Sequence, residues 1–233
     1  MSVPILLYHQ IAVPPPKPMP FRSMFVHPRN FAQQMAWLKR LGYQGLSLKD
    51  ATPYICGEKH GKVVAITFDD GFANVIETAA PILKQCGFTA TNFIVADEIG
   101  GSNTWDQPLG VVHTACMGRE QLRRWMELGH EIGSHTLNHV RLDRMNANEA
   151  RRQITESREK LQSVFGTSIV SFAYPYGEQS PHHRTMVREA GYAWAVTTER
   201  RSANAHDDPA GLPRKTVRRS DTALHFLKKV LTK

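Results

Sequence analysis

The chain has 233 residues, of which 41% are hydrophobic, so it can bury one large core. Barrels of the α/β class commonly form a single domain at this length, and we expect one domain over residues 1–233. No apolar run approaches the roughly 20 residues that span a bilayer. The first ten residues, MSVPILLYHQ, lack the basic segment and cleavage site of a signal peptide. These features predict a cytoplasmic protein without a transmembrane segment.

The formal net charge of +8 is unevenly placed along the chain. Residues 1–50 carry six Lys or Arg and one acid, and residues 199–233 carry nine Lys or Arg and four acids. The basic residues near the C-terminus come in scattered pairs without interleaved aromatic residues, which argues against a nucleic-acid partner. The basic ends are compatible with a phosphate-bearing substrate or with association at a membrane surface. The three cysteines are unclustered and argue against a disulfide framework or a cysteine-built zinc site.

The first half of the chain alternates strands and helices. An apolar run predicts a strand over residues 3–8, and a proline-rich surface loop follows at residues 14–20. Helical spacing of apolar residues predicts a helix over residues 30–41. A second strand over residues 63–68 is apolar at nearly every position, which is typical of a buried parallel strand. It leads to a helix over residues 79–86, which ends at a glycine.

The second half continues this alternation. A strand over residues 88–95 precedes a loop-like stretch at residues 97–117, and a short amphipathic helix follows at residues 119–129. A strand end at residues 130–135 leads to a long helix over residues 146–165 with a capping-box-like start. The remaining elements are a strand at residues 168–175, a helix at 183–190, a strand at 192–198 and a basic helical tail from 221. About seven such units in one domain favour a barrel with its sites at the carboxyl ends of the strands.

Two adjacent carboxylates follow the buried strand in the segment VVAITFDDGF. Asp69 and Asp70 come where the strand ends, and Gly71 permits the positive φ of a sharp turn. Because neighbouring side chains on a strand point to opposite faces, the two acids are expected to have different tasks. The alternative is a loop with two solvated acids.

Two histidines follow another predicted strand in the segment SHTLNH. His135 and His139 are four residues apart, which puts both imidazoles on one face of a helical turn. Two imidazoles and one carboxylate form a catalytic zinc set that leaves positions for water and substrate. One of the two aspartates would then bind the metal, and the other could take a proton from the attacking water.

Two further segments end predicted strands. SFAYPYG runs into an ordered turn whose backbone N–H groups can face a developing oxyanion, although the segment is also explained as a plain turn. In LLYHQI, His9 comes at the carboxyl end of an apolar strand, as the other candidate residues do at the ends of their strands. A reaction that expels an amine needs a proton donor, and His9 is the best placed, although a core histidine is the alternative.

The segments TFDDG, SHTLNH and FAYPYG, in this order, resemble the first three motifs of the polysaccharide deacetylases of carbohydrate esterase family four. These proteins share the deacetylase domain also found in nodulation proteins. The resemblance extends from LLYHQI through AVTT. It implies a distorted (β/α)7-type, TIM-like barrel that removes N-acetyl groups from amino sugars with zinc or another divalent ion. Co²⁺, Ni²⁺ and Mn²⁺ are the alternatives to Zn²⁺.

The same resemblance implies a role for each motif residue. Asp69 would be the general base, and Asp70, His135 and His139 would be the metal ligands. The backbone N–H of Tyr176 would form part of the oxyanion hole.

The general acid departs from the common family pattern. The usual Leu-x-x-His motif near the C-terminus is missing, because His206 and His225 lack a leucine three positions earlier. A subgroup that acts on poly-β-1,6-N-acetylglucosamine and related exopolysaccharides uses a histidine in an N-terminal YH segment, and LLYHQI is similar. The resemblance to this subgroup implies that His9 is the acid.

The third and fourth motifs also depart from the pattern. Ala173 stands where the family has an arginine that orients the base, and the aspartates of the fourth motif are absent around Trp194. We hypothesise that Arg214, in GLPRKTV, supplies the missing charge. Trp194 is either a wall of the acetyl pocket or a core residue.

Two other functions remain as alternatives. A non-catalytic saccharide-binding module would share the fold but would not need Asp69. A two-histidine, one-carboxylate iron oxygenase would share the ligands, but its common scaffold is an all-β jelly roll. The sequence predicts an N-acetylated saccharide as substrate. It does not choose among polymers, nucleotide sugars and lipid-linked precursors, and it carries no signal for the oligomeric state.

Overall fold

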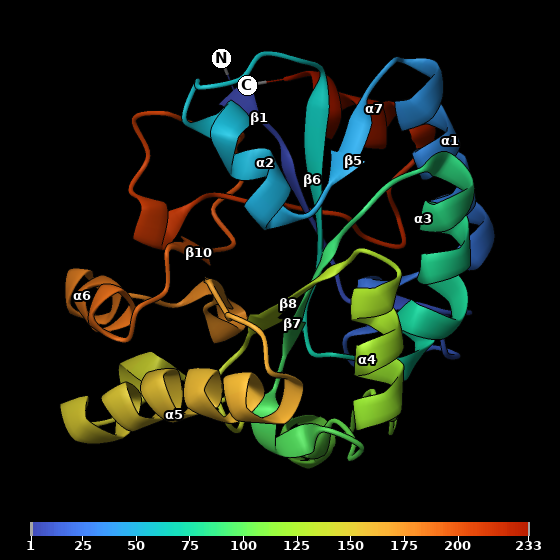
Figure 1. The fold of residues 1–233 in the computed structure, drawn as a ribbon. Helices are drawn as coiled ribbons and strands as arrows, with labels where there is room; N and C mark the ends of the chain where they lie inside the picture. Colours follow the sequence, from blue (N-terminus) through green and yellow to red (C-terminus); the bar gives the residue numbers. More distant parts are fainter. Residues whose placement is uncertain (1, 233) are drawn as a thin grey trace.

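A curled sheet of parallel strands forms the centre of the computed structural model, which describes residues 2–232 (Figure 1). The strand order is β10-β9-β8-β7-β6-β2-β12, and β5 pairs in parallel with the first half of β6. Neighbouring strands along this path pair in parallel. The strands are β2 (Ile5–Tyr8), β5 (Gln44–Leu46), β6 (Val63–Phe68), β7 (Thr91–Ile94), β8 (Glu131–Ser134), β9 (Ser171–Ala173), β10 (Trp194–Val196) and β12 (Lys215–Thr216).

The sheet approaches closure between β10 and β12. Val196 in β10 pairs in parallel with Leu212, which precedes β12. The N–H of Leu212 donates to the carbonyl of Ala195, and its own carbonyl accepts from the N–H of Thr197, each at 2.8 Å. A parallel sheet that curls in this way, with helices between its strands, is a distorted α/β barrel. The predicted fold class is therefore confirmed.

Helices lie around the outside of the sheet (Figure 1). They are α1 (Pro28–Arg40), α3 (Ala80–Cys86), α4 (Arg119–Glu127), α5 (Ala147–Phe165), α6 (Pro181–Glu189) and α7 (Ala223–Leu231). The predicted ends of α5 are confirmed: the Asn146 side chain accepts from the N–H of Glu149, and Gly166 ends the helix at a φ of 64°. No helix within residues 2–232 has both the length and the apolar surface that a membrane span requires.

Successive side chains on a strand point to opposite faces of the sheet, and they belong to two separate hydrophobic clusters. In β6, Val64 and Ile66 belong to the larger cluster between sheet and helices, whereas Val63 and Ala65 belong to a smaller cluster inside the barrel. Helix α2 (Leu48–Ile55) adds three buried side chains to the inner cluster. It lies beside β1 (Ser2–Val3) near one end of the barrel (Figure 1). The opposite end, where the strands have their carboxyl termini, stays open for a site.

Several short elements were not predicted. No pattern in the sequence predicted β5, α2 or the two-residue strand β12. Strands of two or three residues are too short for a hydrophobic period to show, and Pro53 inside α2 argues against a helix. Other short pieces are β1 (Ser2–Val3) paired with β11 (Ala203–Asn204), β3 (Gln10–Ile11) paired with β4 (Phe25–Val26), the π-helical η2 (Val75–Ala79), and the 3₁₀ turns η1 (Arg22–Met24), η3 (Ala96–Glu98), η4 (Thr104–Leu109), η5 (Leu142–Arg144), η6 (Pro175–Gly177) and η7 (Pro209–Gly211).

Candidate active site

A pocket of about 260 Å³ opens where the strands end. Side chains that follow β2, β6, β8, β9 and β12 line it together with residues of η1 and η4. Among its lining residues are six of the seven site residues predicted from the sequence: His9, Asp69, Asp70, His135, His139 and Tyr176. The seventh, Arg214, is fully buried and contacts the pocket through Asp69. The fold thus joins Asp69 to Arg214, which lies 145 positions later in the chain.

Asp70, His135 and His139 form a cluster suited to a metal ion. One ligand atom from each residue lies within 4.8 Å of the other two. The Oδ1 atom of Asp70 is 3.5 Å from Nε2 of His135 and 3.3 Å from Nε2 of His139. Oδ1 is also buried and has no hydrogen-bond partner among the described residues. Ligands that each sit about 2 Å from one ion have such separations, so the donor set fits a divalent metal.

The ring of His135 is oriented by a strand neighbour. Its Nδ1 lies 2.7 Å from the carbonyl oxygen of Ala173, the last residue of β9. A carbonyl accepts only, so Nδ1 must carry the proton and Nε2 is left free as a ligand atom. The third motif therefore contributes a backbone acceptor here, at the position where the family pattern has an arginine.

The backbone of the motifs adopts left-handed conformations at the site. Among residues 2–232, five non-glycine residues have positive φ. Phe21, Asp70, His139 and Tyr176 line the pocket, and Thr136 follows His135. Each such conformation costs about 1–3 kcal/mol and persists only where the surroundings enforce it. Their concentration around one pocket is typical of a functional site.

Asp69 makes a two-pronged ion pair with Arg214. Both guanidinium NH groups donate to the carboxylate at 2.7 Å, and Nε donates to the carbonyl of Thr197 at 2.9 Å. Burial by itself would raise the pKa of Asp69, but the charge of Arg214, with contributions from His135 and His9, holds that pKa below its ordinary value. Asp69 is therefore ionised near neutral pH and fixed in orientation.

His9 lies at the end of β2, half-buried, in the wall of the same pocket. Its Nδ1 is buried without a hydrogen-bond partner among residues 2–232. Its place among the pocket-lining residues favours a histidine that meets a ligand.

Tyr176 closes another side of the pocket. Its ring stands edge-to-face against His139, with centroids 4.8 Å apart, and the guanidinium carbon of Arg141 lies over the Tyr176 ring, 4.0 Å from the ring centroid. The turn continues through Gly177, where a Cβ atom would lie 2.1 Å from Oγ1 of Thr198. Only glycine fits this close approach, which holds the Tyr176 backbone at the pocket.

Three residues of the site had no counterpart in the predictions. Trp105 stacks on His139 with ring centroids 4.8 Å apart. Asp106 lines the pocket beside it, and burial together with the nearby Asp70 charge raises its pKa to about 6. Both lie in η4, inside the stretch expected to be a loop, and neither follows a strand. Arg141 packs on Tyr176 and pairs with Glu178. A search restricted to strand ends could not find them.

Trp194 lies away from these residues. It is in β10 and packs against the cluster inside the barrel. Of the two roles left open for it, the structure favours the core residue over the wall of the acetyl pocket.

Comparisons with known sequences agree with the geometry. The family profile described as polysaccharide deacetylase matches residues 57–195, which is more than half of the chain. YxkH of Bacillus subtilis, named after the same family, is 29% identical over 200 residues, covering 85% of this chain and 65% of YxkH. The poly-beta-1,6-N-acetyl-D-glucosamine N-deacetylase of Staphylococcus aureus is 27% identical over 219 residues, covering 88% of this chain and 71% of that protein.

Two solved structures show the same fold over almost the whole chain. The deacetylase PplD of Streptococcus pyogenes superposes with a TM-score of 0.85 at 24% identity, covering 99% of this chain and 98% of that one. IcaB of Ammonifex degensii superposes with a TM-score of 0.82 at 24% identity, covering 98% and 95%. Together with the profile match and the motif geometry, these findings confirm the resemblance seen in the sequence: the chain belongs to the polysaccharide deacetylase family.

Proposed function

We propose that this chain is a metal-dependent N-deacetylase that removes N-acetyl groups from an amino-sugar-containing saccharide. One observation carries the proposal. A buried carboxylate, Asp69, is held ionised by Arg214 directly beside the ligand cluster of its neighbour Asp70. A module that only binds saccharides has no use for a base oriented in this way.

Asp70, His135 and His139 would hold the ion. A divalent ion there supplies Lewis-acid chemistry, because it lowers the pKa of water and polarises an amide carbonyl. Zn²⁺ suits one carboxylate and two imidazoles best, and Co²⁺, Ni²⁺ and Mn²⁺ are the alternatives.

The remaining residues move protons and stabilise charge. A carboxylate oxygen of Asp69 takes a proton from the water that attacks the acetyl carbonyl carbon. The backbone N–H of Tyr176 donates to the oxygen that becomes negative, an interaction worth about 2.7–4 kcal/mol in other enzymes. As the carbon–nitrogen bond breaks, His9 gives a proton to the leaving nitrogen, and the products are acetate and a free amine. Arg214 keeps Asp69 ionised and pointed at the pocket.

The relatives and the pocket support a proposal for the substrate class. The S. aureus relative is named for poly-β-1,6-N-acetyl-D-glucosamine. We infer that this chain takes a saccharide that contains N-acetylglucosamine. Phe72, Trp105 and Val111 give the pocket an apolar wall, against which a sugar ring or an acetyl methyl group can pack.

Acetate release from N-acetylglucosamine oligosaccharides tests the proposal. We expect the wild type to release acetate, a chelator to stop the release, and added Zn²⁺ to restore it. Asp69→Asn should lower kcat by about 10²–10⁴-fold, which is the usual contribution of a general base. Glu120→Gln, a fully exposed change on α4, serves as the control for loss of one negative charge and should leave the rate unchanged.

Two results would contradict the proposal. In the first, the chelated wild type and the Asp69→Asn variant release acetate as fast as the untreated wild type. This result would show that neither the metal nor Asp69 takes part in the reaction. Saccharide binding without any acetate release by the wild type would instead identify a binding module.

A further inference from the structure

A second hollow of about 240 Å³ lies beside the catalytic pocket. It is formed by the proline-rich segment, by η1 and by the loop that follows β12. Its lining residues include three cations, Lys17, Arg22 and Arg219, and two hydroxyls, Ser23 and Ser220. No acidic residue is among the described residues that line it. A concave surface with this composition favours a negatively charged group.

The two hollows share one wall. In η1, Met24 faces the catalytic pocket while Arg22 and Ser23 face the second hollow. In the loop after β12, Arg218 lines the catalytic pocket and Arg219 lines the second hollow. The N–H of Arg219 donates to the carbonyl of Ser23 at 2.9 Å, which ties the two segments together. A molecule that fills the catalytic pocket can therefore reach over this wall with its next group.

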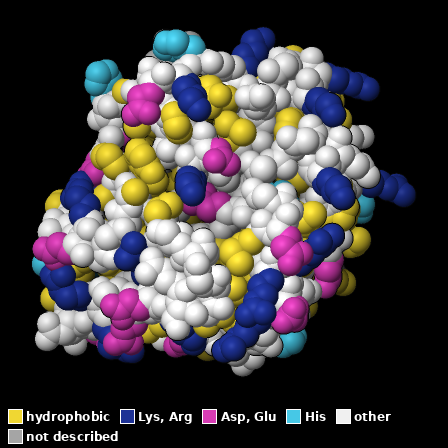
Figure 2. Space-filling model, in the orientation of Figure 1, with side chains coloured by type: hydrophobic (Ala, Val, Ile, Leu, Met, Phe, Trp, Pro, Cys, Tyr) yellow, Lys and Arg dark blue, Asp and Glu magenta, His cyan; other side chains and the backbone are white. Residues whose placement is uncertain are grey.

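Asp221, two positions after Arg219, does not pair with the cations of the second hollow. Asp221 accepts from the backbone N–H of Arg218 at 2.9 Å and pairs with Lys229 on α7. Its side chain is only 9% exposed, so its charge is committed to these partners. Figure 2 shows basic and acidic side chains mixed over much of one face of the molecule. In the second hollow, Lys17, Arg22 and Arg219 come together without a lining acid, and none of them forms an ion pair among the described residues.

We propose that this second hollow is an oxyanion subsite, which holds a phosphate or carboxylate group of the saccharide whose N-acetyl group lies in the catalytic pocket. The inference rests on the proposed deacetylase function. Guanidinium groups bind such oxyanions through paired N–H donors, and the lysine and the two serine hydroxyls add further donors. The polymer or oligosaccharide would then carry its negative group close to the acetylated sugar.

Three N-acetylglucosamine oligosaccharides of equal length test the inference. One is neutral, one carries a phosphate monoester on the sugar next to the acetylated one, and one carries a carboxylate there. We expect the wild type to show a kcat/KM about tenfold higher for an anionic oligosaccharide than for the neutral one, in low salt, as two or three partly exposed ion contacts would give. The preference should shrink as salt is added. The anionic oligosaccharide with the higher kcat/KM shows whether the second hollow prefers a phosphate or a carboxylate.

The double variant Lys17→Gln, Arg219→Gln should lose this preference through a higher KM for the anionic oligosaccharide. Lys59→Gln, Lys84→Gln removes the same charge from exposed positions outside both hollows and should keep the preference. Inorganic phosphate should compete with the anionic oligosaccharide in the wild type and not in the double variant.

Three outcomes would overturn the inference. They are equal kcat/KM values on all three oligosaccharides in the wild type, an unchanged preference in the double variant, and a double variant whose only defect is weaker binding to phosphatidylglycerol vesicles. The last outcome would assign the cations to a membrane surface. The neutral oligosaccharide distinguishes these outcomes from a failure of the proposed function. A wild type that releases acetate from none of the three oligosaccharides would contradict the deacetylase activity itself.

Discussion

At the scale of single residues, the pair of Asp69 and Arg214 decides the chemistry of the pocket. Both side chains are almost completely buried, and two parallel hydrogen bonds join them. Such a pair holds a base ionised and oriented at once. Removing one partner of a buried pair typically costs 3–5 kcal/mol, because the other charge is left uncompensated.

Arg214→Ala should therefore lower kcat/KM by at least about 100-fold and also lower the free energy of unfolding. Arg214→Lys keeps the charge but loses the fork of paired donors, so its activity should lie between those of the wild type and the alanine variant. Steady-state kinetics and thermal unfolding of the three proteins measure both effects. Full activity of Arg214→Ala would show that Asp69 needs no partner.

His130 provides a residue-scale prediction on acid sensitivity. Its ring is buried and stacks on Trp125, with centroids 4.0 Å apart. Burial lowers its pKa from 6.5 to about 4, so the folded state binds this proton less readily than the unfolded state. The stability of the folded state should therefore fall as the pH drops from about 6.5 to about 4, by at most about 3 kcal/mol from this residue.

The variant His130→Phe keeps the stacked ring and has no proton to gain. Its free energy of unfolding should match the wild type near pH 7.5 and exceed it near pH 4. Urea unfolding of both proteins at the two pH values measures the difference. If the free energies of unfolding of the wild type and the variant change with pH in parallel, the low pKa of His130 is contradicted.

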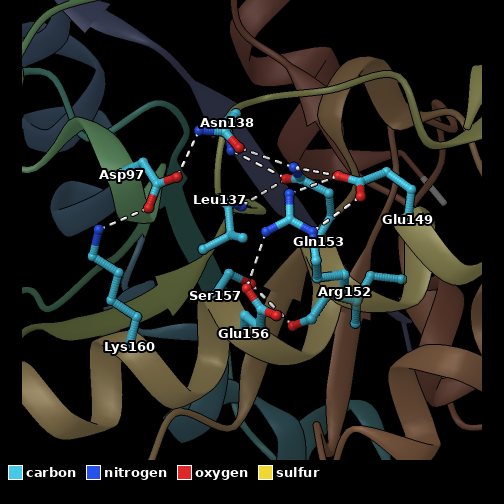
Figure 3. Close-up of polar contacts among 10 residues, drawn as sticks. Asp97, Leu137, Asn138, Glu149, Arg152, Gln153, Glu156, Ser157 and Lys160 are labelled. Carbon is cyan, nitrogen blue, oxygen red and sulfur yellow. Dashed lines mark hydrogen bonds and ion pairs between the residues drawn. The ribbon is translucent and has the colours of Figure 1, made fainter.

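At the scale of elements, helix α5 supports the segment that carries His135 and His139. Oε1 of Gln153 accepts from the backbone N–H groups of Leu137 and Asn138, at 3.0 and 3.2 Å (Figure 3). Nε2 of Gln153 donates to Oδ1 of Asn138 at 2.9 Å. The Gln153 side chain is 2% exposed, so these bonds are shielded from water. One amide on α5 thus fixes the turn between the two imidazoles.

Gln153→Leu should weaken metal binding by about 10–100-fold, the range seen when groups that orient metal ligands are removed. Arg151→Gln, two positions earlier on α5, is the matched control. It loses only an exposed ion pair with Glu189, which is worth little, and should bind metal as the wild type does. Zn²⁺ titration with a chelating indicator measures both variants. Equal affinities would show that the turn holds its shape without Gln153.

The length of an element decides whether the sequence alone predicts it. The long helices and the apolar strands were predicted to within a few residues, because each repeats its pattern several times. Arg214 was expected to supply the missing charge, but the two-residue strand β12 that follows it was not predicted. The 3₁₀ turn η4 was not predicted either, and its site residues Trp105 and Asp106 were therefore missed.

At the scale of the whole molecule, the two hydrophobic clusters share the same strands. Successive residues of β6 point alternately into the inner and the outer cluster, so neither cluster can be lost without the other. This supports the proposal that residues 1–233 form one domain.

One domain should unfold in one cooperative transition. Calorimetry should give a measured enthalpy equal to the van't Hoff enthalpy, and fluorescence and circular dichroism should report the same midpoint. The measurement should be made both with Zn²⁺ and with chelator, because a ligand that binds only the folded state raises the midpoint. Two separate transitions in both conditions would contradict a single domain.

The sequence by itself determined the alternation of strands and helices, the family and the motif residues at the strand ends. Local patterns suffice for these features, because periodicity and motif spacing are properties of consecutive residues. Only the tertiary structure decided that Arg214 meets Asp69 across 145 positions, that Ala173 orients His135, and that two basic segments close one hollow beside the pocket. These contacts depend on how the sheet curls, and that curvature comes from packing over the whole barrel, which no single segment encodes.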